Sequence, residues 1–238
     1  MSKGPLGIRF SAIPAPAPEA GALARIGVEV ENVGSVTWPD GVFLSYHWLD
    51  SRDNPIVWDG VRTAPPRLAP GERAAVELAV RAPIPPGPYR FALDAVVEHR
   101  AWLSELGSEM PRLDVDVHER TGEPDAVFPF WVEPSPAWTE HTRAAHAEGY
   151  AVVAGSIEWE SGLTRRRPRA LQPYAPGTGR IPRFGAPLLC PSVLPGIELE
   201  PLGDVAGLPA FAAPRDEPWI YDGRAVLRAR PQSGRRPT

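Results

Sequence analysis

Proline content sets the strongest limit on what this chain can fold into. The sequence holds 31 Pro among 238 residues, whereas an average protein has ~5% Pro. These prolines are spread over both halves of the chain, and a Pro inside a helix destabilises that helix by about 3 kcal/mol. We therefore expect no long helices. We expect a mainly β protein, built of short strands separated by Pro/Gly turns.

Composition narrows the class of protein further. A net charge of −4 and a hydrophobic content of 43% fit a globular chain. The N-terminal residues lack the apolar core of a signal peptide, and no run of ~20 apolar residues is present to span a membrane. We therefore expect a cytoplasmic protein.

Cys190 is the only cysteine, which excludes an intrachain disulfide and a Cys-based zinc cluster. Its apolar neighbours predict a buried thiol. We expect no metal and no cofactor.

Residues 1–119 predict an antiparallel β-sandwich. Short runs of alternating apolar and polar residues are separated by Pro/Gly turns, which is the pattern of a two-sheet sandwich. The seven predicted strands lie within residues 6–13, 22–34, 42–50, 55–60, 73–83, 89–99 and 112–118.

Three aromatic residues have predicted structural positions in this sandwich. Tyr46 and Trp48 share the apolar face of their strand with Leu44, so we expect both rings in the core. Tyr89 follows a Pro/Gly turn at the start of the next strand, where its hydroxyl can cap the corner between strands, as in immunoglobulin-like domains.

Several segments of this half resemble a known family. The series NVGSVTWPDGVFLSYHWLD, VWDGVRTAPPRLAPGE, APIPPGPYRFALDAVVE and AWLSELG is similar to a bacterial immunoglobulin-like accessory domain of the kind appended to surface-polysaccharide glycosyltransferases. The resemblance covers residues 22–118. It implies an immunoglobulin-like fold and a role in polysaccharide assembly, with a glycan or an assembly enzyme as partner.

A candidate carbohydrate-binding surface follows from two Trp residues in polar surroundings. The predicted surface consists of Trp58, Asp59, Arg62, Trp102 and Glu105. Its rings would stack on sugar faces, and its charged groups would bond to hydroxyls. The alternative is that both Trp residues tie adjacent strands together, with Asp59 or Glu105 paired to Arg62. Exposure of the two rings separates these interpretations, because buried rings cannot stack on a sugar.

Residues 120–238 predict a small βαβ unit followed by a Pro-rich extended segment. Ser135 is a suitable N-cap, a helix is expected over 137–148, and Gly149 is a suitable C′ residue. The later residues are punctuated by Pro and Gly, so we expect a mostly irregular segment there. Residues 161–238 carry an excess of Arg over acidic residues, which predicts either an anionic partner or a solvated basic tail.

Catalytic motifs are weak throughout. Glu158 and Glu160 alternate on one strand, which would place their carboxylates ~6–7 Å apart, within the range of a glycosidase pair. His141 and His146 do not share a helix face, so they predict no zinc site. The Arg cluster at 165–169 lacks the interleaved aromatics of nucleic-acid binders, and GTGR at 177–180 lacks the ending of a phosphate loop.

The sequence as a whole predicts a non-catalytic module in surface-polysaccharide assembly that binds glycan or docks a partner enzyme. The alternatives are a scaffold protein of a larger assembly and a glycan-active enzyme that uses Glu158 and Glu160.

Overall fold

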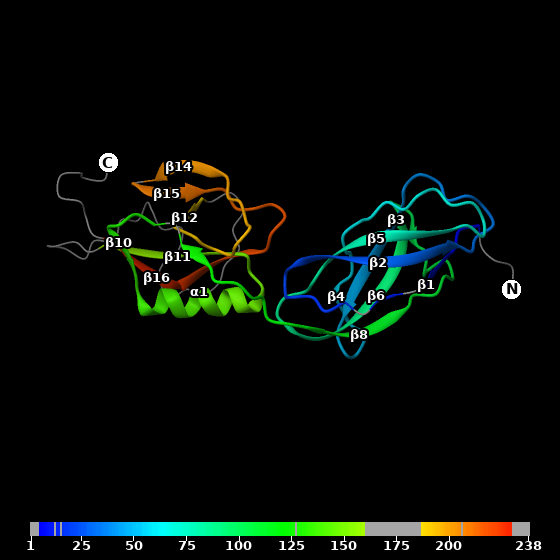
Figure 1. Cartoon of the computed structure of the whole chain (residues 1–238), viewed down its shortest axis with the longest axis horizontal. Helices are drawn as coiled ribbons and strands as arrows, with labels where there is room; N and C mark the ends of the chain where they lie inside the picture. Colours follow the sequence, from blue (N-terminus) through cyan, green and yellow to red (C-terminus); the bar gives the residue numbers. More distant parts are fainter. Residues whose placement is uncertain are drawn as a thin grey trace. The chain divides into compact units, whose positions relative to one another are not determined.

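The structure is a computed structural model of the chain, and it describes residues 5–11, 13–14, 16–126, 128–159, 187–205 and 207–229. The chain divides into two compact units, Met1–His118 and Glu119–Thr238 (Figure 1). The prediction of a mainly β protein is confirmed, because the described residues form sixteen strands and one helix. No helix in the described part is both long and apolar enough to cross a membrane.

Unit 1 contains all seven strands that the alternating pattern predicts. Their bounds are β1 Ile8–Ser11, β2 Leu23–Asn32, β3 Val42–Leu49, β4 Pro55–Val57, β5 Arg73–Arg81, β6 Gly87–Val97 and β8 Arg112–Val117. A further strand, β7 (Ala101–Trp102), pairs with the end of β6. It has two residues, too few for an alternating pattern to be visible in the sequence.

These strands form two antiparallel sheets. One has the order β1-β2-β5, and the other has the order β4-β3-β6-β7 with β8 also paired to β6. In Figure 1, β2 and β5 lie across β3 and β6 as two layers of a β-sandwich. The apolar core lies between the layers, and its largest fully buried side chains include Trp38, Trp48, Tyr46, Phe91 and Leu78.

Tyr46 and Trp48 are core residues, as predicted. Their exposed fractions are 1% and 0%. Both side chains also bond to the backbone of Arg81 on the facing sheet: the Arg81 N–H donates to the Tyr46 hydroxyl at 2.7 Å, and the Trp48 indole Nε1 donates to the Arg81 carbonyl at 2.9 Å. The two rings therefore join the sheets by hydrogen bonds as well as by packing. At the next corner, the hydroxyl of Tyr89 donates to the carbonyl of Pro85 at 2.6 Å, as predicted.

Helix α1 of unit 2 (Pro136–Glu148) begins and ends where its caps predict. The Ser135 hydroxyl accepts a hydrogen bond from the Trp138 N–H, and Pro136 lies in the first turn, where its missing N–H has no intrahelical partner to lose. Gly149 ends the helix with a φ of 120°, in the left-handed region that favours glycine.

A five-stranded sheet carries this helix. Its strands are β9 Asp125–Ala126, β10 Val132–Pro134, β11 Val152–Trp159, β13 Ser192–Val193 and β16 Trp219–Ala229. The order is β10-β16-β11-β13-β9, so β16 lies between the two strands that α1 connects. Because β16 is antiparallel to β10 and parallel to β11, those two strands run in opposite directions. The predicted order of strand, helix and strand is present, but it is not a parallel βαβ crossover.

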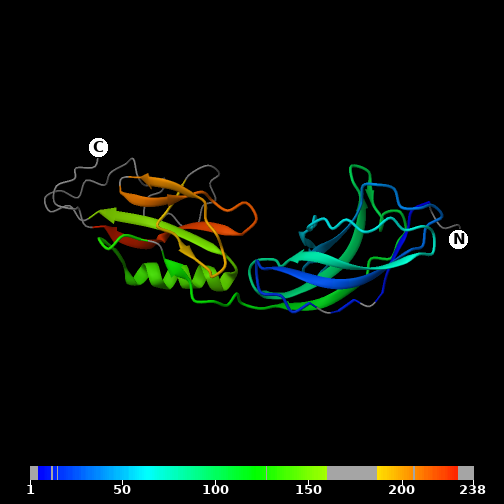
Figure 2. The ribbon, with the colours of Figure 1, turned by 45° about the horizontal axis from the view of Figure 1, so that its top comes forward.

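The Pro-rich segment is more regular than predicted. Three short strands form a second sheet, namely β12 Leu188–Leu189, β14 Pro201–Val205 and β15 Leu208–Phe211, in the order β12-β15-β14. Gly207 has a φ of 80° and lies in the turn between β14 and β15. The Pro and Gly residues therefore stand at turns and strand ends, where they permit short strands. Figure 1 and Figure 2 show this small sheet on the face of the five-stranded sheet opposite α1.

Candidate functional site

A group of buried polar residues lies on the face of the β3–β6 sheet that points away from the sandwich core. In β3, Tyr46 and Trp48 point into the core, so Ser45 and His47 point outward. Asp94 lies opposite Ser45 on β6. Outward residues of a sandwich are usually solvated, yet Ser45, His47 and Asp94 are each 0% exposed.

Two Trp rings cover His47. The Trp58 ring stacks on the imidazole with a centroid separation of 4.0 Å and an interplanar angle of 18°. Trp102 meets the imidazole edge-on at 4.5 Å, and its ring lies 6.2 Å from that of Trp58 at 72°. Trp58 follows β4 and Trp102 ends β7, so the short flanking strands bring the two rings together over the middle of β3.

Hydrogen bonds of His47 and Asp94 hold the two segments that carry the Trp rings. His47 Nδ1 donates to the carbonyl oxygen of Trp58, which holds the backbone that carries the stacked ring. His47 Nε2 lies 3.6 Å from Asp94 Oδ2, and among the described residues it is a buried polar atom without a hydrogen-bond partner. Asp94 accepts hydrogen bonds from the hydroxyl and the N–H of Ser104. Asp94 therefore anchors the segment that follows Trp102.

Arg62 lies beside the Trp102 ring and bonds to the polar residues around it. Its Cζ lies 5.0 Å from the centroid of the Trp102 ring, a distance at which a cation is attracted to the ring face. Nε donates to Glu98 at 2.6 Å, Nη1 donates to Ser45 Oγ at 3.0 Å, and Nη2 pairs with Asp59. Burial acts to lower the pKa of Arg62, but its bonds to Glu98 and Asp59 outweigh this, and the pKa is raised.

Gly60 is required by the close approach of this segment to β3. Its N–H donates to the carbonyl of Tyr46 at 3.1 Å. A Cβ atom at position 60 would lie 2.6 Å from that same carbonyl oxygen, which is closer than real contacts allow. The Trp-Asp-Gly sequence therefore places Trp58 over His47 because glycine lets the backbone touch the strand beneath.

The structure brings the predicted surface residues together. Trp58, Asp59, Arg62 and Trp102 form one group, and Glu105 accepts a hydrogen bond from the Trp102 N–H at 3.2 Å. Trp58 as a residue remains 44% exposed, whereas Trp102 is half-buried. Asp59 pairs with Arg62, as the structural alternative predicts.

Sequence reasoning missed the polar residues beneath the rings and one rim residue. They are Ser45, His47, Asp94, Glu98 and Ser104. The available signal was the position of Ser45, His47 and Asp94, which are polar residues at outward positions of two long strands.

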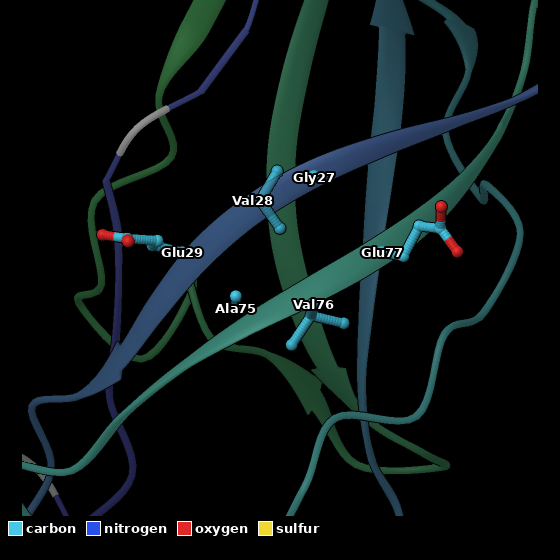
Figure 3. A pocket seen from close by; sticks show the side chains of 6 residues that line it. All are labelled: Gly27, Val28, Glu29, Ala75, Val76 and Glu77. Atoms are coloured by element: carbon cyan, nitrogen blue, oxygen red, sulfur yellow. The ribbon is translucent and has the colours of Figure 1, made fainter.

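A shallow depression lies on the outer face of the other sheet. It is lined by Gly27, Val28, Glu29, Ala75, Val76 and Glu77, and Figure 3 shows Glu29 and Glu77 pointing away from each other on either side of Gly27 and Ala75. The small residues leave the strand backbones uncovered. No aromatic ring lines this depression, so it lacks the stacking surface that the first site has.

The other sequence candidates lie in unit 2. Glu158 has an exposed side chain on β11, while Glu160, the Arg cluster at 165–169 and the GTGR turn lie outside the described residues. His146 is buried, with Nδ1 bonded to the Tyr150 carbonyl and Nε2 to the Ser192 hydroxyl. Within the part of the chain that the structure describes, no group of His, Cys, Asp and Glu is arranged to hold a metal ion.

Comparisons with known proteins give no family. No protein-family model and no curated protein matches the chain. Among solved structures, it is similar to a β-glucosidase from Listeria innocua with 15% identity and a TM-score of 0.30, over 47% of this chain and 16% of the enzyme. It is also similar to the putative ApaA protein from Bordetella pertussis with 22% identity and a TM-score of 0.24, over 48% of this chain and 91% of that protein. A mutant of Salmonella α2-macroglobulin matches at 16% identity and a TM-score of 0.26, over 56% of this chain and 8% of that protein.

Proposed function

We propose that unit 1 is an immunoglobulin-like module that binds carbohydrate through the exposed face of Trp58, in the setting of surface-polysaccharide assembly. The observation that carries the proposal is the state of Trp58: the residue is 44% exposed, and one face of its ring is stacked on a fully buried His47. An exposed aromatic ring on a rigid support is the kind of surface on which the apolar face of a pyranose stacks.

Rigidity supports this function because ordering a side chain on binding reduces affinity. The Trp58 ring is held by the stack on His47, and its backbone is held by the bond from His47 Nδ1 and by the Gly60 contact with β3. Trp58 therefore has little conformational freedom left to lose when a ligand binds. Asp59, with a side chain 68% exposed beside the ring, supplies carboxylate oxygens that accept hydrogen bonds from sugar hydroxyls.

A glycan array with the intact protein tests the proposal, followed by titration calorimetry on the strongest probe. Trp58→Ala is expected to abolish binding, and Trp58→Phe to retain part of it. Phe130→Ala is the matched control, because Phe130 is 91% exposed and belongs to unit 2, so it should leave binding unchanged. Circular dichroism checks that each variant is folded. Binding that survives Trp58→Ala would contradict the proposal.

A docking role is the second candidate, favoured by one observation. Ile56, Trp58 and Val61 are all exposed large hydrophobic residues, at 49%, 44% and 38%, within one six-residue segment. A protein partner would use all three side chains, whereas a sugar ring needs Trp58 alone. Glycan binding that withstands the double change Ile56→Ser and Val61→Ser would therefore favour the carbohydrate function.

A further inference from the structure

We infer that the Trp58 face selects uncharged sugar residues and rejects uronic acids. This inference rests on the proposed function and names its ligand class. It follows from the charges around the ring and from how the guanidinium of Arg62 is engaged.

The guanidinium of Arg62, beside the two Trp rings, already makes hydrogen bonds within the protein through all three of its nitrogens. Arg62 donates through Nε to Glu98 and through Nη1 to Ser45 Oγ and the Gly60 carbonyl, and its Nη2 pairs with Asp59. Its guanidinium also lies against the Trp102 ring. A carboxylate on a ligand is best recognised by a guanidinium that offers two parallel N–H donors. Arg62 can offer this pair only by breaking bonds that hold the site together.

The rings leave one surface for stacking. His47 occupies one side of Trp58, and the Arg62 guanidinium lies over Trp102. Trp102 is therefore a positioning residue, since its ring supports His47 and Arg62 and is itself half-buried. A ligand then stacks on Trp58, beside Asp59.

Negative charge outweighs positive charge at this position. Among the residues that the structure describes, the Arg62 cation pairs with two carboxylates, Asp59 and Glu98, and a third carboxylate, Glu105, accepts from the Trp102 N–H. The Asp59 side chain is 68% exposed and that of Arg62 is 26% exposed, so a ligand meets the carboxylate first. An uncharged sugar donates its hydroxyl hydrogens to such a carboxylate, whereas a uronic acid meets repulsion of like charge.

Paired probes on one array test the inference. The probes are β-(1→4)-linked oligosaccharides of glucose, of N-acetylglucosamine and of glucuronic acid, at equal length. We expect Trp58-dependent binding to at least one uncharged probe and binding to the glucuronic acid probe that is weaker by about fivefold to tenfold, as a single repulsive contact in water produces. Added salt should narrow this ratio, because it screens exposed charges.

Charge-neutral variants separate repulsion from shape. Asp59→Asn keeps the size of the side chain but removes its charge, so the ratio of glucuronic acid binding to uncharged-probe binding should rise toward one. Arg67→Gln is a matched control for a surface charge change elsewhere on unit 1, since the Arg67 side chain is 68% exposed and pairs with Asp40. Glucuronic acid binding equal to or tighter than uncharged binding would overturn this inference and leave the proposed function standing. No Trp58-dependent binding to any array probe would overturn the proposed function and this inference with it.

Discussion

His47 and Asp94 form a fully buried polar pair on the outward face of a sandwich sheet, with His47 Nε2 and Asp94 Oδ2 3.6 Å apart. An outward face normally meets water, so these polar groups would be solvated in a bare sheet. Trp58 and Trp102 remove that water by covering the imidazole. Trp58, the proposed ligand-binding residue, therefore also shields a buried polar pair from water. Both roles depend on the stack of its ring on His47.

Removing the imidazole tests this dependence. His47→Leu removes the donor to the Trp58 carbonyl and the imidazole that lies beside buried Asp94, and we expect it to lower the free energy of unfolding by about 2–3 kcal/mol. Urea unfolding followed by Trp fluorescence measures the change. The double variant His47→Leu with Asp94→Leu removes both polar groups and should be more stable than the sum of the two single effects. Strict additivity would show that the two residues do not interact.

Alanine substitutions at two glycines, Gly60 and Gly27, test the backbone contact beneath Trp58. Gly60→Ala places a Cβ atom 2.6 Å from the Tyr46 carbonyl oxygen, so we expect a loss of about 2 kcal/mol or more in the free energy of unfolding, from displaced backbone. Gly27→Ala is the matched control in the same unit, since nothing lies within 4 Å of a Cβ atom there. That change should be neutral or slightly stabilising, because Ala in a strand loses less entropy on folding than Gly. Equal effects in the two variants would contradict the close approach.

The elements of this fold were predictable where the signal is local. The faces of β3 and β6 follow from alternation over eight or more residues, and the ends of α1 follow from Ser135 and Gly149, each of which acts on its own turn. The strands β12, β14 and β15 were missed because each has five residues or fewer. Their pairing partners lie up to 23 residues away in the chain, as Phe211 does from Leu188, and frequent Pro and Gly hide such pairing.

The candidate site was predictable only at its rim. Trp58 and Trp102 draw attention because nothing in their local pattern requires burial. His47 and Asp94 are 47 residues apart in the chain, and their burial depends on segments that fold over β3 from β4 and β7. The partners of Arg62 show the same limit: the predicted pair with nearby Asp59 is present, but the bond to Glu98 at 2.6 Å was not predicted, because it depends on the pairing of β3 with β6.

Two tyrosine hydroxyls differ in their expected contribution to stability. Tyr46→Phe removes the acceptor that the hydroxyl provides at 2.7 Å to the part-buried Arg81 N–H, so we expect a cost of about 1–3 kcal/mol. Tyr89→Phe removes a bond from its hydroxyl to the Pro85 carbonyl near the surface, where water can replace it, and should cost about 1 kcal/mol or less. Urea midpoints of the two variants give the comparison. A larger effect at Tyr89 would show that the corner, rather than the link between the sheets, dominates.

Cys190 provides a chemical test of unit 2. The thiol is 0% exposed, and burial raises its pKa to about 12. At pH 8 only about one thiol in 10⁴ is then ionised, and the thiolate is the reactive form. We expect the folded protein to react with a disulfide exchange reagent such as Ellman's reagent only as fast as unit 2 opens, and the same protein in urea to release one equivalent promptly. Rapid release of one equivalent from the folded protein would contradict the buried position.

Acid should destabilise unit 2 through His146. Burial lowers the pKa of this histidine, with nearby Arg120 acting in the same direction and the bond to the Tyr150 carbonyl opposing it. An unfolded histidine has a pKa of about 6.5, so below that pH the unfolded state binds a proton that the folded state resists. The stability that His146 provides is therefore fully present above about pH 6.5 and is lost as the pH falls toward the folded-state pKa.

Circular dichroism at 222 nm follows α1 through urea unfolding at pH 7.5 and pH 5. His146→Gln should reduce the difference between the two midpoints, whereas His141→Gln, on the same helix at a half-buried position, should leave that difference nearly unchanged. An undiminished pH dependence in His146→Gln would assign the acid sensitivity to other groups.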